Sequence, residues 1–210
     1  MRLEPLGDSA WIARDFVGPA YQVAMMLNEN KPPGLLEAVA SFETVGLFVD
    51  PQLFDPNSFR ISFVSPNRKE GRLHKIPVCY ELGEDLIRVS NFLNLEAAEL
   101  IELHSGGIYT CFAVGFCPGF AYLGPVPAEI NSTVRLDSPR VLVPPGSVAL
   151  AANQTGVYPL ARPGGWNLIG RTPLEMVSVE ENYFPICAGD QVQFYPVSPG
   201  EFDLMAGGRL

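Results

Sequence analysis

The feature that most constrains the fold is a succession of short β-type segments that fills the chain from residue 108 to residue 198. Each segment is rich in branched or aromatic side chains, and glycine or proline separates it from the next. No helical pattern lies between them, so this region predicts a closed barrel or a sandwich of strands. The segments are "IYTCFAVGF", "VRLDS", "RVLVP", "SVALAA", "GVYPL", "WNLIG", "LEMVSV" and "DQVQFYPV".

The first third of the chain predicts a smaller α+β unit. Residues 4–15 favour a strand or hairpin, and residues 19–30 favour a helix that ends where two prolines and a glycine follow. Residues 35–51 predict two strands, because apolar residues alternate along them. The polar stretch 65–75 predicts a linker. The core candidates of the two strands are Phe42, Val45, Leu47 and Val49.

A strand and two helices are expected between these regions. Residues 76–81 favour the strand, and residues 83–106 favour the helices. Asn94 is the expected N-cap of the second helix, and Gly106 is its expected end. The resulting division of the chain is an α+β domain over residues 1–73 and a mainly β domain over residues 74–210.

Composition and charge exclude several function classes. The formal charge of −9 and a pI of about 4.7, without a cluster of basic residues, exclude a general nucleic-acid-binding surface. The uncharged stretch 103–128 is broken by glycine and proline, so we expect no membrane span. The first residues lack a signal-peptide pattern, and a cytoplasmic protein is expected. Four cysteines without CxxC spacing predict reduced thiols, and two histidines predict no metal site.

Glycine, aromatic residues and arginine gather in the second half of the chain. Ten of the twenty glycines lie between Gly106 and Gly170. They fit either the corners of a barrel or a backbone that a ligand approaches closely. The segment 140–172 contains only three charged side chains, Arg140, Arg162 and Arg171. These arginines could receive a carboxylate or phosphate, or each could pair with an acid such as Asp137 or Glu175.

Three long motifs carry a resemblance to a known family. "GFCPGFAYLG" (115–124), "SPRVLVPPGSVALAANQTGVYP" (138–159) and "RPGGWNLIGRTP" (162–173) follow one another in the chain. With them, the sequence resembles the family of the 5-oxoprolinase B subunit, which includes the sporulation kinase inhibitor KipI and proteins labelled allophanate hydrolase subunit 1. The resemblance implies a ferredoxin-like α+β N-terminal domain followed by a cyclophilin-like β-barrel.

The resemblance also implies a function that depends on partners. The main hypothesis is the B subunit of an ATP-dependent 5-oxoprolinase, which acts with the A and C subunits to convert 5-oxoproline to glutamate. ATP would bind to the complex, and not necessarily to this chain. One alternative is an inhibitor of a sensor histidine kinase that resembles KipI, with a KipA-type partner. Another is a carboxyltransferase-type partner protein in urea or amide metabolism.

Candidate site residues follow from the motifs and the resemblance. Arg171 and His104 are the catalytic candidates, although a histidine at a helix end could equally bond the helix carbonyls. No metal ligand is expected. The substrate-binding candidates form one wall of a site shared with the C subunit: Arg140, Gln154, Thr155, Tyr158, Gly164, Gly165 and Trp166. The partner-binding candidates are Phe116, Pro118, Phe120 and Tyr122.

Overall fold

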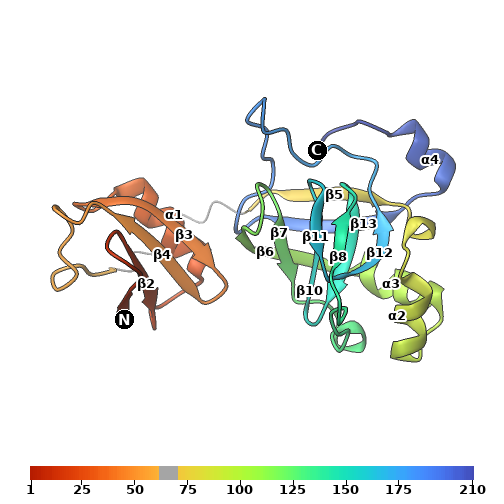
Figure 1. The fold of residues 1–210 in the computed structure, drawn as a ribbon, viewed down its shortest axis with the longest axis horizontal. Helices are drawn as coiled ribbons and strands as arrows, with labels where there is room; N and C mark the ends of the chain where they lie inside the picture. The colour runs from red at the N-terminus through yellow and green to blue at the C-terminus, as the bar shows by residue number, and fades with distance from the viewer. Residues whose placement is uncertain (62–70) are drawn as a thin grey trace. The chain divides into compact units, whose positions relative to one another are not determined.

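The structure is a computed structural model that describes residues 1–61 and 71–210. Its contacts separate two units, Met1–Glu70 and Gly71–Leu210, drawn from red to orange and from yellow to blue (Figure 1). Each unit is described by itself. The helices and strands given below all lie within residues 1–61 and 71–210.

The predicted boundary between residues 73 and 74 falls at the start of strand β5 (Leu73–Val78). Most of the predicted linker, residues 65–75, lies outside the described residues. Its last three residues belong to β5, so the prediction of a linker is wrong there.

The first unit is an antiparallel sheet with one helix against it. The strands lie in the order β1-β2-β4-β3. The helix packs on β3 and β4, and alternate β4 side chains are buried beneath it (Figure 1). An α+β unit is therefore present, as the sequence predicts. Its elements are β1 (Arg2–Pro5), β2 (Ala10–Arg14), α1 (Ala20–Asn30), β3 (Leu35–Ser41) and β4 (Thr44–Val49).

The predicted core of these two strands holds except at one position. Val45, Leu47 and Val49 are buried. Phe42 instead occupies the turn between β3 and β4, with a φ of 53° and 40% of its surface exposed. A tight turn needs a residue with positive φ at this point, and the turn directs the ring away from the core.

Two helices of the second unit, α2 (Leu86–Leu93) and α3 (Ala97–Gly106), match the segment predicted to be helical, with a different cap. The strand predicted over residues 76–81 is β5 only as far as Val78, and η1 (Tyr80–Leu82) follows it. The helices η2 (Ala128–Ile130) and α4 (Pro199–Leu204) were not predicted. Asn94 is not the N-cap of α3: it ends α2 in the left-handed conformation, with a φ of 56°. Glu96 caps α3, in a capping box with Glu99.

The second unit is mainly β, and two clusters of buried apolar residues pack against its largest sheet. In this sheet β13 pairs in parallel with β5 and antiparallel with β6, from which the order continues β6-β7-β10-β9-β12. A separate ribbon pairs β8 with β11. The strands are β6 (Ile108–Val114), β7 (Ala121–Gly124), β8 (Arg140–Val143), β9 (Ser147–Ala151), β10 (Gln154–Val157), β11 (Arg162–Gly164), β12 (Asn167–Arg171) and β13 (Gln191–Pro196).

The predicted closed barrel is not formed, although the mainly β character is confirmed. The two ends of the sheet, β12 and β5, share no ladder of hydrogen bonds. A single bridge joins them through the residue after β5: Cys79 N–H donates to the Arg171 carbonyl at 2.8 Å, and Arg171 N–H donates back at 3.0 Å. Close to this junction, a Cβ at Gly83 would overlap the Ile169 backbone, and a Cβ at Gly170 would overlap the Val78 side chain.

Two predicted strands are absent. Residues 134–138 ("VRLDS") are loop, and residues 174–179 ("LEMVSV") contain one isolated bridge between Ser178 and Tyr183. The other β-type segments coincide with β6, β8, β9, β10, β12 and β13. Across residues 1–61 and 71–210, no helix combines the length and the apolar composition that a membrane span needs.

Candidate functional site

A strained turn lies between β6 and β7, within the motif "GFCPGF". Phe116 has a φ of 68°, which is a rare conformation for a bulky residue. The Cys117 N–H donates to the Gly115 carbonyl at 2.8 Å, so Phe116 is the centre of a three-residue γ-turn of the positive-φ class. The turn leaves the Phe116 ring 59% exposed. Such strain costs about 1–3 kcal/mol and is found most often at functional sites.

The β8–β11 ribbon and the two residues that follow it bring backbone close to aromatic rings. A Cβ at Gly164 would overlap the Tyr158 hydroxyl, so only glycine permits this contact. The backbone N–H of Trp166 donates a hydrogen bond to the same hydroxyl. Burial raises the pKa of Tyr158 and outweighs this bond, so its hydroxyl stays protonated at neutral pH.

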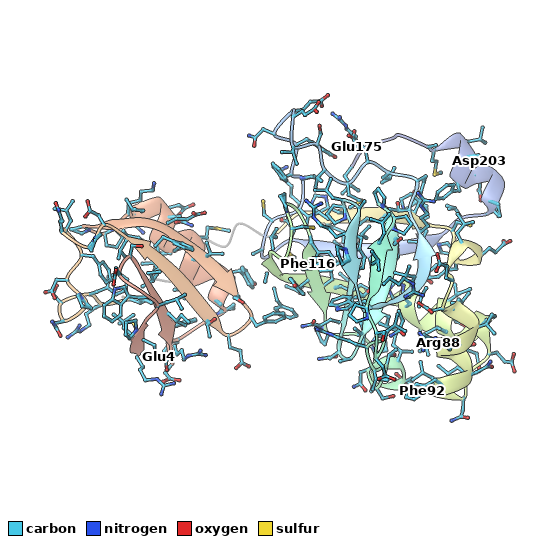
Figure 2. All side chains as sticks on the ribbon, in the orientation of Figure 1. Glu4, Arg88, Phe92, Phe116, Glu175 and Asp203 are labelled. Carbon is cyan, nitrogen blue, oxygen red and sulfur yellow. The ribbon has the colours of Figure 1, made fainter. Side chains whose placement is uncertain are left out.

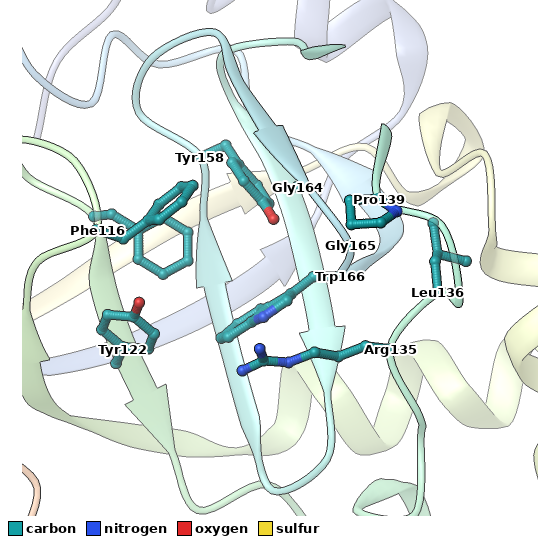
Figure 3. A pocket seen from close by; sticks show the side chains of 10 residues that line it. Phe116, Tyr122, Arg135, Leu136, Pro139, Tyr158, Gly164, Gly165 and Trp166 are labelled. Atoms are coloured by element: carbon teal, nitrogen blue, oxygen red, sulfur yellow. The ribbon is translucent and has the colours of Figure 1, made fainter. Parts of the chain in front are cut away.

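These elements enclose a pocket of about 180 Å³ (Figure 3). Trp166 is 5% exposed. The centroid of its ring lies 5.5 Å from that of Phe120 and 5.9 Å from that of Tyr122, and both pairs have edge-to-face geometry. Such pairs hold the rings in fixed positions. The described residues that line the pocket are Phe116, Phe120, Tyr122, Arg135, Leu136, Pro139, Tyr158, Gly164, Gly165 and Trp166.

Arg135 contributes the charge among these lining residues. Its guanidinium carbon lies 5.8 Å from the centroid of the Trp166 ring, a cation–π distance. Figure 3 shows it beside Trp166, on the side toward Tyr122. Burial raises the pKa of Tyr122, and the positive charge of Arg135 partly offsets that rise. The pocket therefore combines apolar walls with a single positive charge and protonated phenols.

Seven of the residues predicted from the sequence line this one pocket. Four come from the substrate-binding set and three from the partner-binding set, so the structure brings the two sets together. They are Tyr158, Gly164, Gly165, Trp166, Phe116, Phe120 and Tyr122. Pro118 is exposed on the same turn as Phe116 and is not among the lining residues.

Arg140 lies beside the pocket, but acids already occupy most of its guanidinium. Nη2 donates to Asp85 Oδ2 at 2.8 Å, and Nε lies 3.5 Å from Glu84 Oε2. Its third nitrogen, Nη1, is buried without a hydrogen-bond partner among the described atoms. Arg140 therefore pairs with acids, but not with Asp137.

Asp85 is the centre of this buried network. Only 6% of its surface is exposed, and its Oδ2 also accepts the Leu168 backbone N–H at 2.7 Å. Arg88, which projects from α2 (Figure 2), donates to Oδ1 at 3.3 Å. Burial raises the pKa of Asp85, but the Arg140 and Leu168 hydrogen bonds outweigh it and the net pKa is lowered. The network ties α2 to β8 and β12.

The remaining substrate-binding and catalytic candidates are not among the lining residues. Arg171 is half-buried at the end of β12 and donates from Nε to the Pro145 carbonyl at 3.3 Å. Gln154 is half-buried at the start of β10. Thr155 is completely buried and donates to the Ala149 carbonyl at 3.0 Å.

His104 is completely buried in the core, and both of its ring nitrogens are engaged. Because the Thr155 hydroxyl donates to a carbonyl, it must accept from His104 Nε2–H, at 2.8 Å. Nδ1 then carries no proton and accepts the Tyr80 hydroxyl at 2.7 Å. The ring stacks on Phe194, with the centroids 4.7 Å apart. Burial lowers the pKa of His104 to about 3.

This geometry opposes the predicted catalytic role of His104. A general base must reach the proton that it takes from a substrate, and its pKa should lie near the working pH. His104 has neither property, and it joins α3 to η1 and β10 as a neutral polar bridge. Among the described residues, no group of three or more histidine, cysteine or acidic side chains could hold a metal ion.

Sequence reasoning missed three lining residues, Arg135, Leu136 and Pro139. The first two lie in the segment "VRLDS", for which the sequence predicts a strand. The one available signal was that the alternation of this segment is too short for a secure strand. The positions of these residues depend on contacts with β12 and Gly165, which are distant in the sequence.

Comparisons with known proteins agree with the sequence resemblance. The chain matches the family described as "Carboxyltransferase domain, subdomain C and D" over residues 1–185. The 5-oxoprolinase B subunit of Bacillus subtilis (strain 168) is 34% identical, over 96% of this chain and 95% of its own length. The protein of that name from Escherichia coli O157:H7 is 43% identical, over 62% of this chain and 61% of its own length.

Among solved structures, the crystal structure of TTHA0988 has a TM-score of 0.77 and 32% sequence identity. The match covers 90% of this chain and 40% of that one. This chain therefore spans less than half the length of that similar protein.

Proposed function

Because this chain belongs to the carboxyltransferase subdomain C and D family, and its relatives are named as B subunits of 5-oxoprolinase, we propose that it is the B subunit of a 5-oxoprolinase. The observation that carries the proposal is the Bacillus subtilis relative, whose 34% identity extends over 96% of this chain and 95% of its own. At this coverage, the similarity to the relative extends over both units of this chain. The reaction would open the lactam of 5-oxoproline to give glutamate.

The proposed enzyme works as a complex with the A and C subunits. The match to TTHA0988 supports a neighbouring partner, because there the similar part occupies only 40% of one longer chain. The exposed Phe116 turn, with Pro118 beside it, is the proposed partner contact at the rim of the pocket. Neither relative's name favours the kinase-inhibitor or the urea-metabolism alternative.

ATP is proposed to bind outside this pocket. The pocket of about 180 Å³ is smaller than sites for drug-sized ligands, which occupy about 300 Å³ or more. A nucleotide triphosphate also needs several donors for its phosphates, and Arg135 is the one cation among the described lining residues. These residues do not fit ATP.

The fold relationship of each unit and the cellular location of the protein are also proposals. The ββαββ arrangement of the described part of the first unit supports a ferredoxin-like relationship, and the curled sheet of the second unit supports a cyclophilin-like one. A cytoplasmic complex would have direct access to ATP.

Reconstitution tests the proposed function. The purified A and C subunits are mixed with ATP and 5-oxoproline, with and without this chain, and glutamate is measured. We expect glutamate only when this chain is present. Equal glutamate without it would contradict the proposal, as would no glutamate from an assembled complex of all three proteins.

A further inference from the structure

We propose that the pocket beside Trp166 binds a small cyclic carboxylic acid, with Arg135 as the carboxylate-binding residue. The inference rests on the proposed function in one respect, namely that the acid is 5-oxoproline. The site itself is assigned from the geometry of the lining residues. Arg135 replaces Arg140 and Arg171 as the residue expected to bind the carboxylate.

The size and walls of the pocket select a ligand with a single small ring. A volume of about 180 Å³ accommodates a single small ring with one or two polar substituents. Trp166, Phe120 and Tyr122 pack edge to face and present rigid aromatic surface. A larger ligand would have to displace rings that are held on more than one side.

The charge of the pocket selects an anion. Arg135 is the single charged group among the described lining residues, and no acid lines the pocket with it. No hydrogen bond or ion pair engages its guanidinium within residues 1–61 and 71–210; its recorded ring contact is with Trp166. A cation–π contact fixes the position of the charge while leaving N–H donors for a bidentate pair with a carboxylate.

Arg140 and Arg171 are less suitable for this role. Arg140 already pairs with Asp85 and Glu84. A substrate carboxylate there would have to compete with a buried aspartate. Arg171 bonds the Pro145 carbonyl away from the lining residues. Of these three arginines, Arg135 alone combines position in the pocket with free donors.

The loop that carries Arg135 is held on both sides, which pre-organises the site. Asn167 Nδ2 donates to the Val134 carbonyl at 2.8 Å. The Leu136 N–H donates to the Gly165 carbonyl, also at 2.8 Å. These bonds attach the residues before and after Arg135 to the strand region that carries Trp166. A fixed guanidinium and a fixed ring lose less entropy when a ligand binds.

Fluorescence of the full chain tests the proposal, because the chain contains only two tryptophans. Replacing Trp11 in the first unit (Trp11→Phe) leaves Trp166 as the single reporter. This variant is titrated with 5-oxoproline and with its neutral carboxamide. We expect a saturable change with the acid, and binding of the carboxamide at least about tenfold weaker, because a hydrogen-bonded charge pair is lost.

Two further substitutions identify the binding residue. In the Trp11→Phe background, Arg135→Gln should weaken 5-oxoproline binding by about tenfold or more, and Arg135→Lys should restore part of it. Arg72→Gln is the matched control, since Arg72 is exposed in the same unit and does not line the pocket. Circular dichroism confirms that each variant is folded.

Three results would overturn the proposal: no saturable response to 5-oxoproline, equal affinity for acid and carboxamide, or equal weakening by Arg135→Gln and Arg72→Gln. Failure of the proposed function looks different. A fully assembled complex that forms no glutamate, while this chain still binds the acid through Arg135, would refute the enzyme assignment and support the site.

Discussion

Replacing His104 with glutamine is expected to remove a pH dependence of stability that the buried imidazole creates. Burial lowers the pKa of this histidine to about 3, whereas a histidine in an unfolded chain has a pKa of about 6.5. Below about pH 6.5 the unfolded state therefore binds a proton that the folded state does not bind. Stability is then lost as the pH falls from about 6.5 toward about 3.

The size of the effect follows from the two pKa values. Between about pH 7 and about pH 5, protonation of one unfolded-state histidine lowers the free energy of unfolding by about 2 kcal/mol. The wild-type chain should lose this amount in addition to whatever His104→Gln loses. His74, which pairs with Asp190 at 3.1 Å, is present in both proteins, so its contribution cancels in the comparison.

Urea unfolding at the two pH values measures the difference. Tyr80→Phe is the matched control: it removes the 2.7 Å hydrogen bond to His104, at a cost of about 1 kcal/mol, but keeps the imidazole. It should therefore keep the pH dependence of the wild type. If His104→Gln lost as much stability on acidification as the wild type, the imidazole would not be held neutral by burial, and its structural assignment would be refuted.

Three further outcomes are expected. Gly164→Ala should weaken 5-oxoproline binding in the fluorescence titration by displacing the adjacent tyrosine, whereas Gly106→Ala, which meets no atom within 4 Å, should not; equal effects would contradict this. Asp85→Ala should lower the free energy of unfolding by about 3–5 kcal/mol in urea, because the Arg140 guanidinium loses its closest acid and the buried Leu168 N–H loses its acceptor; a loss below about 1 kcal/mol would argue against the network. Cys187 should react with a thiol reagent in the folded chain while the three buried cysteines react only after unfolding, and mass spectrometry of the labelled peptides checks the order.

Much of the fold was predictable because local patterns and tertiary contacts agree. In β4, alternating Val45, Leu47 and Val49 lie on the buried face, as period-2 spacing predicts. The segment "SVALAA" is apolar after its first residue, and β9 is buried along its whole length between β10 and β12. The pattern does not reveal whether the sheet closes, because closure depends on which strand ends meet. Here a single bridge at Cys79 and Arg171 replaces a full ladder.

The failures occur where distant contacts override local preference. Residues 134–138 have a weak strand pattern, but Asn167 and Gly165 bind the backbone there and hold it as a loop. Asn94 is a good N-cap by type, yet asparagine also tolerates the left-handed conformation, and here it ends the preceding helix.

The candidate site was also predictable only in part. Its aromatic and glycine residues lie in recognisable motifs, and these motifs indicate Tyr158, Gly164 and Trp166. Arg135 lies outside these motifs. Its position depends on the hydrogen bond from Asn167 to the Val134 carbonyl, and these two residues are 33 positions apart in the sequence. The arginine-only segment points to Arg140 instead, which the fold pairs with Asp85.

The kinetics of the reconstituted complex test the central claim most directly. The KM for 5-oxoproline is measured from glutamate formation by the A and C subunits combined with the wild-type chain, Arg135→Gln or Arg72→Gln. We predict a KM raised by about tenfold or more for Arg135→Gln alone, because the carboxylate loses its charged partner. An active complex with the same KM for all three chains would contradict the account of this site.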